Sequence, residues 1–293
     1  MTRVLDCHVH IFPTAEEGIF WQEAVGLTAP RSGVLADFVA YMDASGLSGA
    51  VVLLFHRSAQ TLEALVGEGV PVQDARAEVV RRIRAYNRWG CEAAEDDPRL
   101  LPFVGVNPSM MSGPEMRSEI EELATRGARG VKIIPPAIGL PVNADDYEPI
   151  YEACCSLGLP LLSQSGAGAT PDAPAHGRPR LFADVLDRHG ELKLILAHMA
   201  RGFERELHEL LDSYPNVVTD TSSRLEHLNE DGQWTRNEMR DFVRGLGAER
   251  VLYGTNFPLA DPARSLAVLE SLGLTPREFA QITSENLERV LAR

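Results

Sequence analysis

Short runs rich in valine, isoleucine and leucine recur along the chain, and segments with helical patterning separate them. This alternation is typical of a parallel β-sheet whose strands are joined by crossover helices. The runs are Val4 to His10, Ala50 to Phe55, Leu101 to Val106, Gly130 to Ile134, Leu159 to Gln164, Leu192 to His198, Asn216 to Thr221 and Arg250 to Thr255. Eight alternations within 293 residues predict an α/β protein, a (β/α)8 barrel or TIM barrel, in one domain over residues 1–293.

The segments between the runs differ in length according to which end of a strand they join. Those that enter a strand are short turns such as Asp97-Pro98, whereas long segments leave the strands: Ile11 to Ser32, Arg57 to Val72, Ser165 to Arg178 and Ser222 to Thr235. Active sites of (β/α)8 barrels are built at the C-terminal ends of the strands. We therefore expect the site at that rim. The segment from Ser165 to Arg178 is equally compatible with a lid and with a flexible connection.

The charge balance bears on the class of partner. The chain has 28 lysine and arginine residues against 42 aspartate and glutamate residues, a formal net charge of −14. This sign is wrong for binding nucleic acid or an anionic membrane, so a small-molecule substrate fits better. Four cysteines, two of them the adjacent pair Cys154-Cys155, offer no disulfide framework, and no leader or long apolar span is apparent. We expect a reduced, cytoplasmic protein with no membrane partner.

Residues whose side chains could act in catalysis or bind a metal ion stand at the ends of the strand-like runs. His8 and His10 end the first run, and because side chains of a strand alternate between faces, both imidazoles should point the same way. Cys7, between them, should then pack outward against helices. The other candidates at or just beyond strand ends are His56, Lys132, Gln164, His198, Asp220, Arg224 and Asn256. In a closed barrel these groups would converge on one cavity.

The motifs that hold these residues resemble the amidohydrolase superfamily, in its amidohydrolase-related branch. They are Asp6-Cys-His-Val-His10, Gly130-Val-Lys, Leu196-Ala-His-Met, Asn216-Val-Val-Thr-Asp-Thr-Ser, Gly254-Thr-Asn-Phe-Pro and Ile282-Thr-Ser-Glu-Asn286, and they span nearly the full chain. The branch also contains decarboxylases similar to aminocarboxymuconate-semialdehyde decarboxylase. The resemblance implies a barrel enzyme that acts on a small molecule, and homodimers are common among the proteins it resembles.

The resemblance also implies a divalent metal ion, but two ligand positions differ. Members bind the ion through the paired histidines of the first strand, a histidine that ends the fifth strand and an aspartate that ends the eighth. His8 and His10 match this pattern, whereas Gln164 and Asn256 stand in the other two positions. Neutral amide oxygens suit harder ions than zinc and supply no negative charge. We therefore expect zinc at His8 and His10 to be weakly bound or absent.

Other side chains are left open as replacement ligands. Asp220 or Asp261 could supply the missing carboxylate, and His56 or His176 could supply a nitrogen. Nothing in the spacing requires any of them.

The resemblance and the chemistry of the side chains together suggest roles. His198 matches the sixth-strand histidine that acts near the substrate, and an ordinary imidazole titrates at a pKa of about 6.5. Asp220 is the second choice as base, although it could equally cap a turn. Lys132 either steadies negative charge on the substrate or extends outward to water.

A further group is expected to bind the substrate. Gln164 and Asn256 would orient it through amide hydrogen bonds, and Arg224 would also contact it. His56 together with Arg57 could bind an acidic substrate or simply lie in solvent. Trp21, in the long first loop, is the aromatic residue expected to cover a ligand.

The leading hypothesis is an enzyme that hydrolyses an amide, ester or lactone bond of a small, anionic organic molecule. A lyase that decarboxylates its substrate is the alternative within the same branch. A third hypothesis is a non-catalytic ligand-binding protein whose metal site has decayed, in line with the substitutions at Gln164 and Asn256. Fold alone does not decide among them.

Overall fold

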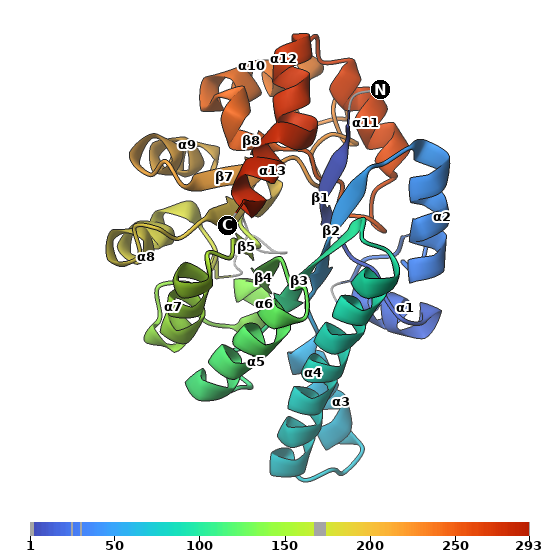
Figure 1. The fold of residues 1–293 in the computed structure, drawn as a ribbon, viewed down its shortest axis with the longest axis vertical. Coiled ribbons are helices and arrows are strands. Elements are labelled where there is room, and N and C mark those ends of the chain that lie inside the picture. Colours follow the sequence, from blue (N-terminus) through green and yellow to red (C-terminus); the bar gives the residue numbers. More distant parts are fainter. Residues whose placement is uncertain (1–2, 25, 30, 167–173, 293) are drawn as a thin grey trace.

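Eight parallel strands form one sheet in which each strand pairs with the next along the chain (Figure 1). The computed structural model describes residues 3–24, 26–29, 31–166 and 174–292. The strands are β1 (Leu5–Val9), β2 (Gly49–Leu54), β3 (Leu100–Gly105), β4 (Gly130–Ile133), β5 (Leu161–Ser163), β6 (Leu194–Leu196), β7 (Val217–Asp220) and β8 (Val251–Leu252). Backbone hydrogen bonds from Cys7 to Tyr253 (2.8 Å) and from His10 to Phe257 (2.7 Å) join β1 to the β8 segment and close the barrel.

Helices surround the sheet on its outside (Figure 1). They are α1 (Ala15–Glu23), α2 (Leu35–Ser45), α3 (Ser58–Gly67), α4 (Val72–Asp96), α5 (Gly113–Thr125), α6 (Pro135–Ile138), α7 (Glu148–Leu157), α8 (Phe182–Arg188), α9 (Glu204–Ser213), α10 (Arg236–Leu246), α11 (Pro262–Glu270), α12 (Pro276–Ala280) and α13 (Asn286–Leu291). Among the described residues, no helix is both long and apolar enough to cross a membrane. The predicted (β/α)8 barrel is confirmed.

The strand side chains are divided between two apolar clusters. In β2, Val52 and Leu54 pack with the surrounding helices, whereas Val51 and Leu53 belong to the inner cluster. This alternation is the period of two that a barrel strand requires. Phe103 contributes an aromatic ring to the inner cluster, and a Cβ atom at Gly130 would lie 2.5 Å from that ring. The barrel interior is therefore packed with side chains, and the site must lie at one end of it.

Strand β1 departs from regular alternation. Its pairing with β2 shifts in register between Asp6 and Val9, and Cys7 packs in the inner cluster with Leu5. The expectation that Cys7 points outward is therefore wrong, because an irregularity in the strand resets the alternation. A Cβ atom at Gly254 would lie 3.0 Å from both Cys7 Sγ and His8 Cβ, so glycine in β8's extension leaves room for this arrangement.

Every predicted run overlaps an observed strand, but β2 and β3 begin one residue before their runs and several strands end earlier than the run. β6 ends at Leu196, and Ala197–Ala200 forms a tight helical turn instead of continuing to His198 as a strand. Most of the segment predicted as a lid or a connection, residues 167–173, lies outside the described residues. The shortened strands leave their polar ends free to turn over the mouth of the barrel.

Candidate active site

A buried cluster of two imidazoles, one carboxylate and one hydroxyl lies where β1, β6 and β7 end. His8 Nδ1 is 2.8 Å from Asp220 Oδ2, and the ring centroids of His8 and His198 are 5.0 Å apart. Ser222 Oγ lies 3.1 Å from His8 Nδ1 and 2.7 Å from His198 Nδ1. His8 is thus brought within hydrogen-bond distance of Asp220 and Ser222, which lie more than 190 positions further along the sequence, as the barrel prediction requires.

Asp220 is the acceptor around which the cluster is organised. Its Oδ1 accepts hydrogen bonds from the backbone N–H groups of His198 (2.9 Å) and Ser222 (3.0 Å) and from the Ser222 hydroxyl. Burial by itself would raise the pKa of Asp220, but its electrostatic interaction and hydrogen bond with the His8 ring outweigh burial and lower the pKa. Asp220 is therefore a carboxylate at neutral pH.

The hydrogen bonds also fix the imidazole tautomers. Since a carboxylate accepts and does not donate, we assign the proton of His8 to Nδ1. The Ser222 hydroxyl donates to Asp220, so it accepts from His198 Nδ1, and His10 Nδ1 likewise donates to the Leu53 carbonyl at 3.3 Å. Each ring is left with a lone pair on Nε2 that could take a proton. A metal ion shared by His8 and Asp220 would have to replace the proton on His8 Nδ1.

All three imidazoles are neutral at pH 7. Burial lowers the pKa of His8, with the Asp220 carboxylate opposing the shift in part. Burial, and to a smaller extent the neighbouring His8, lower the pKa of His198 to about 3. Burial and then His8 hold the pKa of His10 well below its ordinary range. Neutral imidazole is the form that binds metal ions and accepts protons.

Backbone strain is concentrated in the segments that form this cluster. His198, Met199 and Ala200 have φ values of 63°, 49° and 46°, and Asn256 and Ser223 have φ values of 72° and 56°. Such left-handed conformations are disfavoured for residues other than glycine and gather at functional sites. The strain marks the same strand ends as the side-chain chemistry does.

Asn256 is held as a structural link between β8 and its neighbours. Its Nδ2 donates to Ser223 Oγ at 2.7 Å, and its backbone N–H donates to the His8 carbonyl at 2.8 Å. Asp6 supports the same junction, since it accepts from the backbone N–H of His8 (2.9 Å) and from Thr255 Oγ1 (2.6 Å). Burial raises the pKa of Asp6 to about 7, against the lowering effect of Thr255.

Lys132 is almost wholly buried and does not extend outward along the surface. It is 1% exposed on β4, and burial lowers its pKa to about 7, with the Asp220 charge opposing the shift. No residue in the described part of the chain accepts a hydrogen bond from its ammonium group. A buried cation that forms no direct ion pair is a costly arrangement, and a ligand anion would reduce that cost.

Gln164 presents an unused acceptor. Its Oε1 atom is buried and has no hydrogen-bond partner, while its backbone N–H donates to the Ile133 carbonyl at 3.0 Å. Buried polar atoms in folded proteins are generally paired, so an orphan acceptor beside a candidate site is a position for a ligand donor.

The remaining predicted binding residues lie apart from this cluster. Arg224 pairs with Glu204 (3.3 Å), and its guanidinium lies 4.3 Å from the ring centroid of Trp234. His56 Nδ1 is 3.2 Å from Ser58 Oγ, and burial lowers the pKa of His56 to about 4. Neither belongs to the group around Asp220.

Trp21 connects the cluster to its surroundings. Its ring centroid is 4.3 Å from that of His10, and its indole N–H donates to the Phe55 carbonyl at 3.2 Å. It is 5% exposed and packs against the His10 ring, and its role as a cover for a ligand stays a prediction.

The donor atoms that could share one metal ion belong to His8, His198 and Asp220, within 4.8 Å of one another. His10 lies beside this set, but its donor atoms are not part of it. Of the replacement carboxylates left open by the sequence, the geometry favours Asp220, because Asp261 caps α11 and pairs with Arg31 at 2.8 Å. Two imidazoles and a carboxylate fit zinc or manganese, and the carboxylate removes the objection that the site has no negative charge.

Ser222 was missed in the sequence, although a signal for it was present. It follows Asp220 by two positions in Asp-Thr-Ser-Ser, so in an extended segment it faces the same side as the carboxylate. Serine is too common beyond strand ends for that spacing to identify it without the structure.

Comparisons with known proteins agree with this picture. Decarboxylase orsB of Emericella nidulans is 22% identical over an alignment 311 residues long. The alignment covers 82% of this chain and 88% of that protein. A dihydroxybenzoic acid decarboxylase from Polaromonas sp. JS666, solved with manganese and 2-nitroresorcinol, has a TM-score of 0.70 and 15% identity, covering 99% of this chain and 97% of its own.

A putative 2-pyrone-4,6-dicarboxylic acid hydrolase from Pseudomonas putida has a similar fold, with a TM-score of 0.68 and 17% identity over 99% of this chain and 98% of its own. At these identities the two solved structures support the fold. The family model described as Amidohydrolase matches residues 5–293, and the chain therefore belongs to the amidohydrolase family.

Proposed function

We propose that this chain is an enzyme that releases carbon dioxide from a small organic acid. The observation that supports this reaction most directly is Lys132, a buried amine that forms no direct hydrogen bond or ion pair among the described residues and whose charge the Asp220 carboxylate favours only in part against burial. A substrate carboxylate would supply the missing anion. Decarboxylation thus moves from the alternative of the sequence analysis to the favoured hypothesis, and orsB, the matched relative, is named a decarboxylase.

The reaction breaks the bond between the carboxylate carbon and its neighbour. The electron pair of that bond stays on the neighbouring carbon, carbon dioxide leaves, and one proton must be delivered to the same carbon. An ammonium group that pairs with the carboxylate before the bond breaks is beside that carbon afterwards, so Lys132 is well placed to donate the proton. A pKa of about 7 makes this transfer feasible at neutral pH.

A divalent ion would be held by His8, His198 and Asp220, the set that fits it in donor type and spacing. Such an ion, when bound, polarises a substrate oxygen and so stabilises negative charge that develops during the reaction. Gln164 Oε1 would accept a hydrogen bond from a substrate hydroxyl or amide, because that atom is buried without a partner. His10 and Trp21 would form the wall on which the substrate rests.

The test is product analysis on a panel of small aromatic and unsaturated carboxylic acids, with zinc, manganese or cobalt supplied. We expect carbon dioxide release and, in deuterium oxide, one deuterium on the product carbon. The Lys132→Met variant should lose at least about 10²-fold in kcat/KM, the range typical of a lost proton donor. Lys193→Met, which changes an ammonium group at the opposite end of the barrel near the Ala292 carbonyl, is the matched control.

Other outcomes point to the other hypotheses. Uptake of ¹⁸O from water into the product without carbon dioxide release would show a hydrolase acting on an amide, ester or lactone. Tight binding without any turnover would show a non-catalytic binder. Cytoplasmic location and a homodimer, both expected from the sequence, are kept as proposals, and size measurement in solution tests the second.

A further inference from the structure

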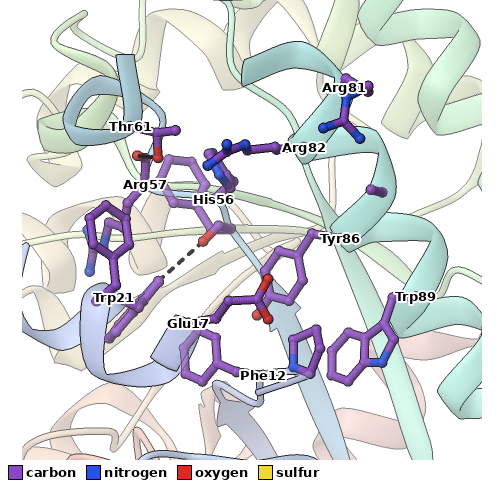
Figure 2. Close-up of a pocket in the computed structure, with 14 residues that line it drawn as sticks. Phe12, Glu17, Trp21, His56, Arg57, Thr61, Arg81, Arg82, Tyr86 and Trp89 are labelled. Atoms are coloured by element: carbon purple, nitrogen blue, oxygen red, sulfur yellow. Dashed lines mark hydrogen bonds between the residues drawn. The ribbon is translucent and has the colours of Figure 1, made fainter. Parts of the chain in front are cut away.

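A cavity lies beside the barrel mouth, between α1, α3 and α4 (Figure 2). Its volume is about 550 Å³, within the range of small-molecule sites. Six aromatic side chains line it: Phe12, Phe20, Trp21, Phe55, Tyr86 and Trp89. The cluster around Asp220 contributes no residue to this lining, but the two regions are neighbours, because Trp21 also contacts His10.

Arg57 is the charged group inside this cavity, and its charge is not compensated. The residue is 6% exposed, and its Nε atom is buried without a hydrogen-bond partner. No carboxylate within the described part of the chain forms an ion pair with it. Its guanidinium lies 4.1 Å from the ring centroid of Trp21. Burial lowers the pKa of Arg57 to about 10, which leaves it charged at neutral pH.

The position of Arg57 is fixed by the start of α3. Its backbone carbonyl accepts hydrogen bonds from the Thr61 N–H (3.1 Å) and the Thr61 hydroxyl (2.9 Å). The guanidinium is thus presented from a rigid element while the side chain rests on Trp21 (Figure 2). A fixed planar fork with unused N–H donors matches a planar carboxylate better than any other common group.

The other charged groups at the cavity are on its rim and already engaged. Arg81 and Arg82 both pair with Glu78 at 2.7 Å, and their side chains are 69% and 46% exposed. Glu17 is exposed on α1 and accepts a hydrogen bond from the Thr14 hydroxyl at 3.4 Å. The depth of the cavity therefore holds an unpaired positive charge, and its acidic group lies toward solvent.

The walls suit a flat apolar ring. The rings of Phe12 and Tyr86 are stacked with an interplanar angle of 4° at 6.2 Å, and those of Tyr86 and Trp89 are stacked at 5.7 Å. The Tyr86 hydroxyl is already used, since it donates to the Ile11 carbonyl at 2.6 Å. The Tyr86 ring thus offers its apolar surface, and aromatic rings pack favourably on such surfaces.

We propose that this cavity is a binding site for an aromatic carboxylate, with the carboxylate on Arg57 and the ring against Trp21 and Tyr86. The proposal stands on the cavity, the buried guanidinium without an ion-pair partner and the aromatic walls, and its test needs no turnover at the Asp220 cluster. One buried cation balances one negative charge, which favours a monocarboxylate over a phosphate ester.

Calorimetry with the full chain tests this site with simple probes. We expect benzoate to bind with a dissociation constant at or below the millimolar range, while methyl benzoate, which lacks the charge, and acetate, which lacks the ring, each bind at least tenfold more weakly. Phenyl phosphate should also bind more weakly than benzoate. Arg57→Met should weaken benzoate binding at least tenfold, which corresponds to about 1.4 kcal/mol, and Arg57→Lys should weaken it less.

Two controls separate this cavity from the candidate active site and from misfolding. Arg205→Met, at an exposed arginine of α9, should leave benzoate binding unchanged. His198→Gln should also retain it, whatever its effect on turnover. Thermal unfolding should show that the Arg57 variants are folded. Unchanged benzoate affinity in Arg57→Met, loss of affinity in His198→Gln alone, or no benzoate binding by the natural chain would each overturn the proposal.

Discussion

The cluster around Asp220 and the cavity around Arg57 bury charge in opposite ways. In the cluster the Asp220 carboxylate is satisfied by His8, Ser222 and a backbone N–H, and the surrounding backbone is strained. In the cavity the Arg57 guanidinium has no such partner, and apolar rings surround it. A hydrogen-bond network whose polar groups are all paired without a ligand holds those groups in a fixed, reactive geometry. A buried charged group that lacks a partner is instead suited to binding a ligand of opposite charge.

Trp21 is the side chain that the two regions share. One of its contacts is the His10 ring at 4.3 Å, and another is the Arg57 guanidinium at 4.1 Å. The two regions are thus neighbours separated by one aromatic residue. Substitutions in one region with readouts for both test whether the two regions are also separate in function.

The largest expected effect comes from Asp220→Asn. The amide cannot hold the His8 proton on Nδ1 in the same way, and the site loses its carboxylate, so kcat/KM should fall about 10³- to 10⁴-fold, as for an orienting aspartate in a catalytic triad. Benzoate affinity should change less than twofold, because Arg57 is untouched. Steady-state kinetics and calorimetry on one preparation check both. If the variant kept its activity within tenfold, Asp220 would not be essential for catalysis.

Lys132→Met should make the protein more stable as well as inactive. The folded pKa of Lys132, about 7, lies below the ordinary 10.5, so the buried charge costs stability fully below pH 7, and this cost diminishes as the pH rises toward 10.5. We expect the variant to gain about 1–4 kcal/mol below pH 7, the range for replacing buried charges by apolar groups, and less at pH 9. Urea unfolding at pH 6 and pH 9 measures this difference. A gain that is equal at both values, or a loss, would contradict the shift.

The smallest effect concerns the strained backbone of the cluster. Asn256 has a φ of 72°, which alanine disfavours and glycine accepts. Asn256→Ala should lower the free energy of unfolding by about 1–2 kcal/mol, and Asn256→Gly by less, although both lose the hydrogen bond to Ser223. Equal destabilisation by the two variants would assign the loss to that hydrogen bond and not to the backbone.

Much of the fold was predictable because eight buried strands leave eight apolar runs. The convergence of His8, His198 and Asp220 was also predictable, since the ends of parallel strands meet at one rim. What the pattern could not show is the irregularity in β1 that turns Cys7 inward, because a register shift depends on how β2 pairs with β1. The alternation rule assumes a regular strand and fails where the strand is not regular.

The candidate site was predictable in its residues more than in its connections. The sequence shows that Asn256 replaces a carboxylate, but it does not show that Asp220 lies 2.8 Å from His8 and can take over that charge. The cavity was hinted at by His56, Arg57 and Trp21, yet the lack of a partner for Arg57 depends on which acidic residues lie nearby. Contacts of this kind are set by tertiary packing.

The central claim is that Asp220 supplies the negative charge that the eighth strand lacks. Elemental analysis of the natural chain and of Asp220→Asn, both purified without chelator and dialysed with equal manganese or zinc, tests it most directly. We predict close to one divalent ion per chain in the natural protein and less than about one tenth of that in the variant, because losing a ligand should cost at least the roughly 10- to 100-fold in affinity that losing a ligand's hydrogen-bond partner costs. Equal metal content in the two proteins, or none in the natural chain, would contradict the claim.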